Sequence, residues 1–333
     1  MSGKLVLILI LIAVLLALAA WIISVMIRDN RRFVVRRYHV GSAKLPRPVT
    51  LVFLSDMHEN TYGEDNALVL QAIDEVRPDA VLVGGDMIVS SKAGVGEEDW
   101  YEHTVSLLKK LSQKYPVYVT DGNHETALRV SRHHTSCYSM LRLKYEELGL
   151  RFLDNESAVL EPEGIAPVTG GQHTAEPEMA SADEKKIIIH GFCPGRIWYK
   201  KFRYRKMPPE VITEKIGEAG GSAFHILMSH HPRYFPAYAA WGADLTLSGH
   251  LHGGIARLPK IGGVVSPDPA FFPKYSGGMY QLPKGRAGID PASSGAPDSE
   301  PAVMICSCGM GMHTLPIRVW NPAELTVVHL EPR

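Results

Sequence analysis

Side chains that can bind a metal ion follow five short apolar segments of this 333-residue sequence. In chain order the segments are TLVFLS (50–55), AVLVGG (80–85), PVYVTDG (116–122), FHILMS (224–229) and DLTLSG (244–249). The residues that follow them are Asp56 and His58; Asp86; Asn123, His124 and Glu125; His230 and His231; His250 and His252. Unbroken apolar runs are typical of buried strands, and strand ends in open α/β sheets line the ligand crevice. We therefore expect these side chains to converge on one site.

The joint placement of these groups supports this hypothesis more strongly than any single motif. Asp-x-His and His-x-His are each expected about 0.6 times by chance, and Gly-Asn-His about 0.02 times. Scattered polar residues that only satisfy hydrogen bonds would not fall directly behind five strands. Imidazole nitrogens together with oxygen donors suit Mn, Fe or Zn better than Ca.

These motifs resemble the signature of the calcineurin-like metallophosphoesterase family. They are SDMH (55–58), GGD (84–86), GNHE (122–125), SHHP (229–232) and GHLHGG (249–254), in the order that the family has them. The resemblance implies an α/β fold, a four-layer α/β/β/α sandwich of two mixed sheets. It also implies hydrolysis of a phosphodiester, pyrophosphate or phosphomonoester with two divalent transition-metal ions, Mn being favoured. The N-terminus and LPIRVWNPAELTVVHL (315–330) resemble more narrowly a membrane-associated bacterial branch that includes UDP-2,3-diacylglucosamine pyrophosphatases and related phosphodiesterases.

The resemblance further implies a role for each site residue. The first metal would be held by Asp56, His58, Asp86 and His252, and the second by Asp86, Asn123, His230 and His250. Asp86 would bridge the two ions, and a hydroxide between them would attack phosphorus. His124 would bind no metal and would stabilise the transition state or donate a proton to the leaving group. Glu125 would orient His124 or its loop.

Several residues near these motifs have competing interpretations. His231 competes with His230 as a ligand, but the motif position favours His230 and leaves His231 lining the pocket. Cys306 and Cys308 have metal-ligand spacing, yet both fall in a predicted strand, which favours structural burial. Four aromatic residues of predicted loops could shape a substrate-facing or membrane-facing pocket, although single exposed aromatics are common: Trp198, Tyr199, Phe271 and Phe272.

The N-terminal segment has the composition of a membrane span. Residues 5–27 contain no charge, and as a helix they would extend roughly 34 Å, enough to cross a hydrocarbon core of about 30 Å. A cleaved signal peptide is the alternative, with a cleavage site at residues 17–19, but the apolar run continues beyond it and favours a retained span. One lysine precedes the span and five arginines follow it within residues 28–37, which predicts a single-pass protein with a cytoplasmic catalytic domain.

The remaining sequence predicts one catalytic domain. We expect an anchor over 1–30, a basic linker over 31–48 and the metallophosphoesterase domain over 49–333, with surface insertions near 161–186 and 281–301. Helices are expected over 65–76, 99–114 and 138–148. Further strands are expected over 187–191, 303–308, 315–320 and 325–330, the last three in the second sheet.

Composition limits the functions that the chain can have. It contains 35 basic and 35 acidic residues and no basic-aromatic stripe, which argues against a nuclease and a nucleic-acid partner. Four cysteines form no disulfide framework and favour a reducing compartment. A non-catalytic membrane scaffold is an alternative from another class, although every ligand position is filled. We expect a phosphate-ester substrate, and the membrane span favours a lipid-linked one; the sequence leaves the oligomeric state open.

Overall fold

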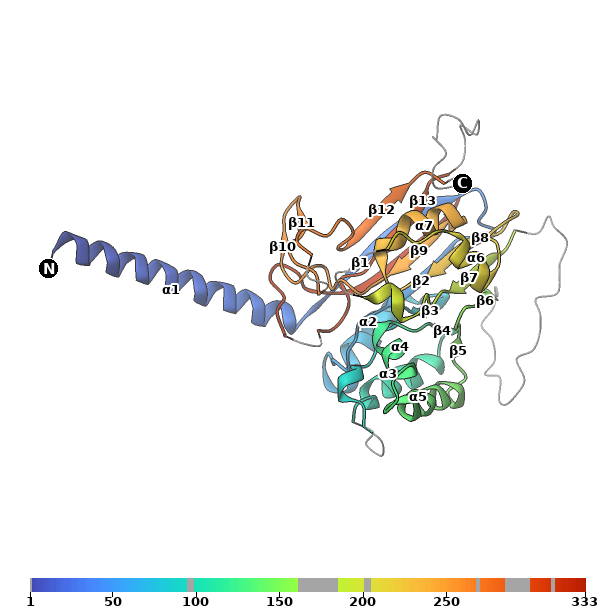
Figure 1. Cartoon of the computed structure of the whole chain (residues 1–333), viewed down its shortest axis with the longest axis horizontal. Helices are drawn as coiled ribbons and strands as arrows, with labels where there is room; N and C mark the ends of the chain where they lie inside the picture. Colours follow the sequence, from blue (N-terminus) through green and yellow to red (C-terminus); the bar gives the residue numbers. More distant parts are fainter. Residues whose placement is uncertain are drawn as a thin grey trace.

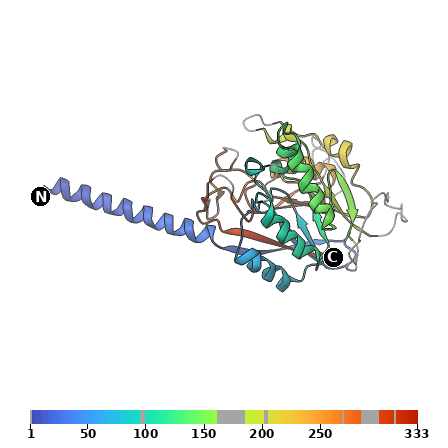
Figure 2. The ribbon, with the colours of Figure 1, turned by 90° about the horizontal axis from the view of Figure 1, so that it is seen from below.

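The computed structural model describes residues 2–94, 99–160, 185–200, 205–267, 270–284, 300–312 and 315–333. Within these residues a long N-terminal helix, α1 (Gly3–Asn30), projects from a body that contains two six-stranded sheets (Figure 1). Figure 2 shows the same projection from below, with the helix extending from one end of the body.

The first sheet consists, in spatial order, of β1 (Phe33–Ser42), β14 (Ala323–Pro332), β2 (Val49–Leu54), β3 (Ala80–Val83), β4 (Val117–Val119) and β5 (Arg151–Phe152). The second sheet consists of β12 (Gly278–Leu282), β13 (Ala302–Cys306), β9 (Leu245–Ser248), β8 (Phe224–Met228), β7 (Ile187–Gly191) and β6 (Glu156–Val159). A small ribbon pairs β10 (Arg257–Leu258) with β11 (Gly262–Gly263). The other helices are α2 (Ala67–Val76), α3 (Glu102–Ser112), α4 (Asn123–Arg129), α5 (Thr135–Glu147), α6 (Glu210–Ile216) and α7 (Phe235–Trp241).

Both sheets mix parallel and antiparallel pairs. In the first sheet β2, β3, β4 and β5 are parallel neighbours, whereas β14 and β2 are antiparallel. In the second sheet β13, β9, β8 and β7 are parallel, and the outer strands β12 and β6 are antiparallel to their neighbours. The parallel strands of each sheet therefore place their carboxyl ends at a common edge, where loops from several strands can meet.

Alternate residues of the central strands face different cores. Leu51 and Phe53 of β2 point into the cluster between the two sheets, and Val52 and Leu54 pack against α2, α3 and α5 on the outside. Leu227 of β8 belongs to a third cluster, which joins the second sheet to α6 and α7. Because both faces of these strands are buried, their sequences are apolar without interruption. The predicted α/β/β/α sandwich of two mixed sheets is confirmed.

The segment 31–48, which we expected to be a basic linker, is largely a strand. Residues 33–42 form β1, which pairs in parallel with β14 along its whole length of 10 residues. Edge strands often carry charged side chains, which discourage pairing with other chains. Arg36 and Arg37 on this edge strand made the segment resemble a solvated linker.

Two expectations about the C-terminal segments are also wrong. Residues 315–320 form no strand; within them Val319 makes only an isolated bridge to Ala256. The last strand, β14, lies in the first sheet between β1 and β2, and only β13 joins the second sheet as expected. Arg318 explains the irregular backbone, because its buried guanidinium binds carbonyl groups of neighbouring loops.

The expected helices over 65–76, 99–114 and 138–148 correspond to α2, α3 and α5, and the short helices α4, α6 and α7 were not predicted. Of the two predicted insertions, 161–184 lies outside the described residues. In the other, 281–282 complete β12 and 285–299 lie outside the described residues.

Two buried histidines of the second sheet make the fold sensitive to acid. Nε2 of His190 lies 2.9 Å from Nδ1 of His225, and the ring of Trp241 meets His190 edge-on. Burial, together with the neighbouring His225, lowers the pKa of His190 to about 3. The unfolded chain therefore binds more protons than the folded chain below about pH 6.5, so stability is lost as the pH falls.

We expect His190→Gln to remove about 1.4 kcal/mol per pH unit from the pH dependence of the unfolding free energy between about pH 6 and pH 4. The measurement is urea denaturation of the full chain in detergent at each pH. The exposed His133 provides the control, because His133→Gln should leave the dependence as it is. An unaltered dependence in the His190 variant would contradict the assignment.

Candidate metal centre

The loops after β2, β3, β4, β8 and β9 bring the predicted ligands together. Three groups of these predicted residues have their potential ligand atoms within 4.8 Å of one another: Asp56, His58 and His252; His58, Asp86 and His124; and Asp86, His230 and His250. A fourth such group among the described residues, Asp121, Asp154 and Cys193, contains none of the predicted ligands. His58 and Asp86 each belong to two groups, so the three groups form one continuous centre. Its members are buried or nearly so.

Asn123 joins this centre as the first residue of α4. The next residue, His124, donates its backbone N–H to Oδ1 of Asp86 at 2.8 Å, which fixes the start of the helix against that carboxylate. Oδ1 of Asn123 is buried and has no hydrogen-bond partner among the described residues. A buried amide oxygen without a donor is costly, and a cation would satisfy it.

Three histidines direct the same ring nitrogen toward the centre. Nδ1 lies 3.2 Å from a backbone carbonyl oxygen in His58, 2.8 Å in His230 and 2.9 Å in His252. The carbonyls belong to Ile88, Gly84 and Gly311. Because a carbonyl only accepts hydrogen bonds, each neutral ring carries its proton on Nδ1 and presents the lone pair of Nε2 to the centre.

The spacing of these nitrogens fits metal ligation. The Nε2 atoms of His58 and His252 are 3.3 Å apart. Two lone pairs at this distance repel each other unless a cation lies between them. Bonds of about 2.0–2.1 Å from one zinc-like ion would place two ligand nitrogens roughly 3.0–3.4 Å apart.

In the ring of His124 the protonated and unprotonated nitrogens are exchanged relative to these three histidines. Its Nδ1 accepts the backbone N–H of Ser90 at 3.0 Å, so the neutral ring carries its proton on Nε2. That nitrogen lies 4.0 Å from Oδ2 of Asp86, and the side chain is 12% exposed. His124 is therefore arranged to donate a proton beside the centre, whereas the three histidines above are arranged to donate electron pairs.

The electrostatics of the centre favour positive charge. Nε2 of His230 lies 3.1 Å from Asp86 and 3.7 Å from Asp56. Burial alone would lower the pKa of His230, but these two carboxylates outweigh it and raise the pKa to about 10. Burial raises the pKa of Asp56; His230 opposes this rise and the neighbouring Asp86 adds to it. Divalent cations would neutralise both carboxylates, and the mixed oxygen and nitrogen donors fit transition metals.

Glu125 positions two of the loops. Its buried carboxylate accepts the backbone N–H groups of Asp86, Met87 and Gly122, each at 2.9 Å. One side chain thus joins the loop after β3 to the loop after β4. Burial raises the pKa of Glu125, as does the charge on Asp86. Of the two expected roles, the hydrogen bonds support orientation of the loop.

The backbone at the centre is strained. Five of the predicted ligands have positive φ angles between 49° and 72°: Asp56, His58, Asp86, His250 and His252. Non-glycine residues rarely adopt this conformation, and such residues cluster at functional sites. Gly249 allows the close approach of the loops, because a Cβ at this position would lie 2.1 Å from Oγ of Ser55.

A sixth loop, residues 307–312 after β13, contributes to the centre and was missed in the sequence. Gly311 accepts the ring N–H of His252 and donates its own N–H to the carbonyl of Asp56 at 2.6 Å. The neighbouring Met310 donates to the carbonyl of Ser55 at 3.0 Å. These contacts use backbone atoms, so the residue types gave no chemical signal beyond two glycines in CGMGM (308–312).

Arg318 holds the sixth loop in place through hydrogen bonds to its backbone. Its side chain is fully buried and donates hydrogen bonds to the backbone carbonyls of Cys308, Gly309, Gly311 and Asn321 at 2.9–3.2 Å. Asn321 in turn donates its side-chain N–H to the carbonyl of His252 at 2.6 Å. A buried arginine solvated by carbonyl groups cannot be recognised from sequence spacing, because its partners lie in an irregular loop.

The other candidate residues lie as follows. His231 is buried with its ring 4.4 Å from that of His250, and it stacks on Tyr199, so both residues line the centre. Cys306 and Cys308 are buried free thiols outside the metal-binding groups found among the described residues. Trp198 packs against the third core cluster. Phe271 and Phe272 are exposed in the loop after β11.

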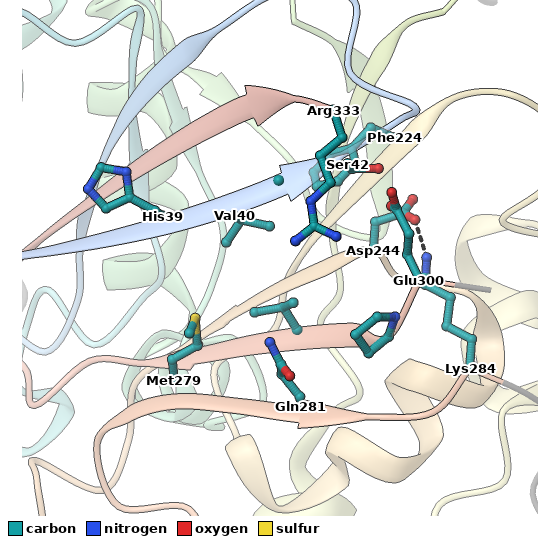
Figure 3. Close-up of a pocket in the computed structure, with 13 residues that line it drawn as sticks. His39, Val40, Ser42, Phe224, Asp244, Met279, Gln281, Lys284, Glu300 and Arg333 are labelled. Carbon is teal, nitrogen blue, oxygen red and sulfur yellow. Dashed lines mark hydrogen bonds and ion pairs between the residues drawn. The ribbon is translucent and has the colours of Figure 1, made fainter. Parts of the chain in front are cut away.

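The cavity shown in Figure 3 is separate from this centre. It has a volume of about 50 Å³ and is lined by residues of β1, β8, β12 and β13 and of the segments beside them, and no candidate ligand lines it. The carboxylate of Asp244 faces Lys284 there, and Lys44 approaches the same carboxylate at 3.2 Å. A space of this size holds only a few water molecules.

The fold and this centre define a metal-dependent phosphoester hydrolase. The sequence pattern of the family described as calcineurin-like phosphoesterase matches residues 49–254, a range that includes every candidate ligand. The chain therefore belongs to the calcineurin-like phosphoesterase family, whose members use divalent metal ions to hydrolyse phosphoric esters.

Two proteins of Bacillus subtilis (strain 168) are similar to most of the chain. The first, described as uncharacterized metallophosphoesterase YkuE, is 25% identical over 291 residues, which cover 84% of this chain and 78% of that protein. The second, described as uncharacterized protein YpbG, is 25% identical over 285 residues, which cover 85% of this chain and 81% of that protein.

We expect Glu125→Gln to weaken Mn²⁺ binding by about 10- to 100-fold, because an amide NH₂ would face a backbone N–H in place of an accepting oxygen. Equilibrium dialysis with Mn²⁺ measures this effect on the full chain in detergent. The exposed Glu214 on α6 provides a matched control, and Glu214→Gln should bind Mn²⁺ like the unmodified protein. Equal affinity in both variants would show that Glu125 does not position the ligands.

Proposed function

We propose that this chain is a membrane-anchored phosphohydrolase with a centre for two divalent transition-metal ions, Mn being favoured. The observation that carries the proposal is the difference in the partners of Nδ1: carbonyl groups face this nitrogen in His58, His230 and His252 and leave Nε2 to a cation, whereas a backbone N–H faces it in His124. A site that only satisfied buried polar groups would have no need of this difference.

The ligand groups support two adjacent ion sites. We assign the first ion to Asp56, His58, Asp86 and His252, and the second to Asp86, Asn123, His230 and His250. Asp86 is within reach of both sets, so its carboxylate would be held in common by the two ions. The orphaned oxygen of Asn123 supports its place in the second set.

Bound at this centre, two divalent cations would lower the pKa of a water molecule to supply the nucleophile, and would withdraw charge from the phosphate oxygens. His124 donates its Nε2 proton to the leaving oxygen, and Ser90 keeps the ring in the orientation that makes this transfer feasible. The rings of Tyr199 and His231 cover one side of the centre and limit access of water.

The helix α1 anchors the domain in a membrane. It is 28 residues long, and its apolar side chains are exposed around the whole helix, which is unfavourable in water. Its last turn belongs to the folded body, since Asp29 is fully buried and accepts the backbone N–H of Asn321 at 3.0 Å. Cleavage after residue 19 would leave four exposed apolar side chains attached to that body, which favours a retained span: Trp21, Ile22, Ile23 and Ile27.

The anchor also bears on orientation and substrate. The arginines after the span favour a cytoplasmic catalytic domain. A centre held at the bilayer surface meets lipid-linked phosphates at a high local concentration, so we assign an amphiphilic phosphodiester, pyrophosphate or phosphomonoester as the substrate class.

His124→Ala should lower kcat for bis-p-nitrophenyl phosphate or p-nitrophenyl phosphate by about 10²- to 10⁴-fold, because the general acid is lost. The metal content of the variant should stay near that of the unmodified protein, since His124 is assigned no ligand role. Activity is measured in detergent with Mn²⁺, and metal content by elemental analysis.

His133→Ala changes an exposed histidine of the same region and serves as the control. Full activity of the His124 variant would refute the acid role. Activity of the unmodified protein that survives exhaustive metal removal would refute the metal-dependent mechanism as a whole.

A further inference from the structure

A basic cavity lies beside the inner end of α1, apart from the metal centre. It has a volume of about 560 Å³, and its lining includes Arg36 from β1 together with Arg257, Lys260 and Lys274 from the loops around β10 and β11. Tyr280 and Trp320 complete one side of it. The described residues that line the cavity include no acidic side chain.

Among the described residues, only one of these four basic side chains forms an ion pair with a carboxylate. Arg36 forms an ion pair with the buried Glu324 at 3.2 Å. Arg257 binds backbone carbonyls instead, at 2.9 Å from Gly253 and 3.0 Å from Ser276, which fixes its guanidinium at the wall of the cavity. Lys260 and Lys274 are exposed at the opening. This arrangement suits an anion that carries at least one full charge.

The cavity adjoins the proposed membrane span directly. The ring of Trp320, which lines the cavity, lies 5.5 Å from the ring of Trp21 on α1. Asn30, at the end of α1, donates its side-chain N–H to the carbonyl of Pro316 at 2.6 Å. In Figure 1 the ribbon of β10 and β11 lies next to the end of α1. Tryptophan side chains are typical of the boundary between hydrocarbon and headgroups.

An apolar rim surrounds this end of the body. Among the described residues outside α1, 10 large apolar side chains are exposed, and five of them lie in the segments 255–275 and 315–320: Ile261, Phe271, Phe272, Leu315 and Trp320. The most exposed is Phe271, at 77%. A backbone bridge from Phe271 to Val265 holds its loop near the ribbon, and a bridge from Val319 to Ala256 joins the two segments.

We propose that this cavity binds the phosphate headgroup of an anionic phospholipid, while the apolar rim enters the bilayer that α1 spans. The inference rests on the membrane anchoring proposed above but not on the assignment of the metal ligands. A bilayer is the occupant that explains both features, because a basic pocket bordered by exposed aromatic side chains matches the headgroup region and the hydrocarbon beneath it. The bound lipid would fix the orientation of the catalytic domain on the membrane.

The test uses the full chain in neutral detergent micelles, titrated with dioctanoyl phosphatidylglycerol or dioctanoyl phosphatidylcholine, and native mass spectrometry counts the bound lipid. We expect phosphatidylglycerol to bind more tightly than phosphatidylcholine. Lys260→Gln combined with Lys274→Gln should weaken the binding of phosphatidylglycerol by about 30-fold. Lys109→Gln combined with Lys215→Gln removes the same charge from α3 and α6, and should leave binding within twofold.

Equal affinity for the two lipids, or equal losses in the two double variants, would overturn the proposal. Displacement of phosphatidylglycerol by an equimolar amount of inorganic phosphate would indicate a site for free anions and would also overturn it. Hydrolysis of bis-p-nitrophenyl phosphate by the unmodified protein is measured in parallel. An active enzyme that binds no anionic lipid would refute this inference and leave the proposed hydrolase intact.

Discussion

The burial of two carboxylates, Asp56 and Asp86, beside one histidine is the constraint on which the centre depends. Both lie within 4 Å of Nε2 of His230, away from water, where negative charges are costly unless cations neutralise them. Strand ends from both sheets meet at this centre, and the fold thereby buries the two carboxylates although their burial is unfavourable in free energy. Left-handed backbone at five of the candidate ligands and the absence of a side chain at Gly249 allow the loops to approach so closely.

Backbone groups that contact Nδ1 determine whether each histidine ring can donate an electron pair or a proton from Nε2. Carbonyl groups at Nδ1 turn His58, His230 and His252 into electron-pair donors, and one amide N–H at Nδ1 turns His124 into a proton donor. The four rings are chemically the same, so their different roles come from partners in other loops. Ser90 and Gly311 therefore matter to the chemistry although neither side chain is assigned a reactive role.

Much of the fold could be predicted from the sequence, because strands buried on both faces have unbroken apolar sequences, as β2 and β8 show. The convergence of the candidate ligands followed from their position behind such strands, while their individual roles stay proposals. The edge strand β1 was missed because its two arginines, Arg36 and Arg37, make the sequence resemble a solvated linker. The loop after β13 was missed because it contributes backbone atoms, which are the same in every residue, and Arg318 was missed because its guanidinium binds such backbone atoms. Ring tautomers could not be predicted because they depend on partners that only the folded chain brings close.

The buried Asp29 of α1 holds the backbone of Asn321, whose side chain holds the backbone of His252. Only one residue thus separates α1 from a candidate metal ligand. A fragment that begins after residue 30 would lack Asp29, so Asn321, whose side chain holds the backbone carbonyl of His252, would lose one of its own hydrogen bonds. Activity measured on such a fragment would describe a centre without this support, so the last turn of α1 contributes to the folded domain in addition to the role in attachment that we propose for the helix.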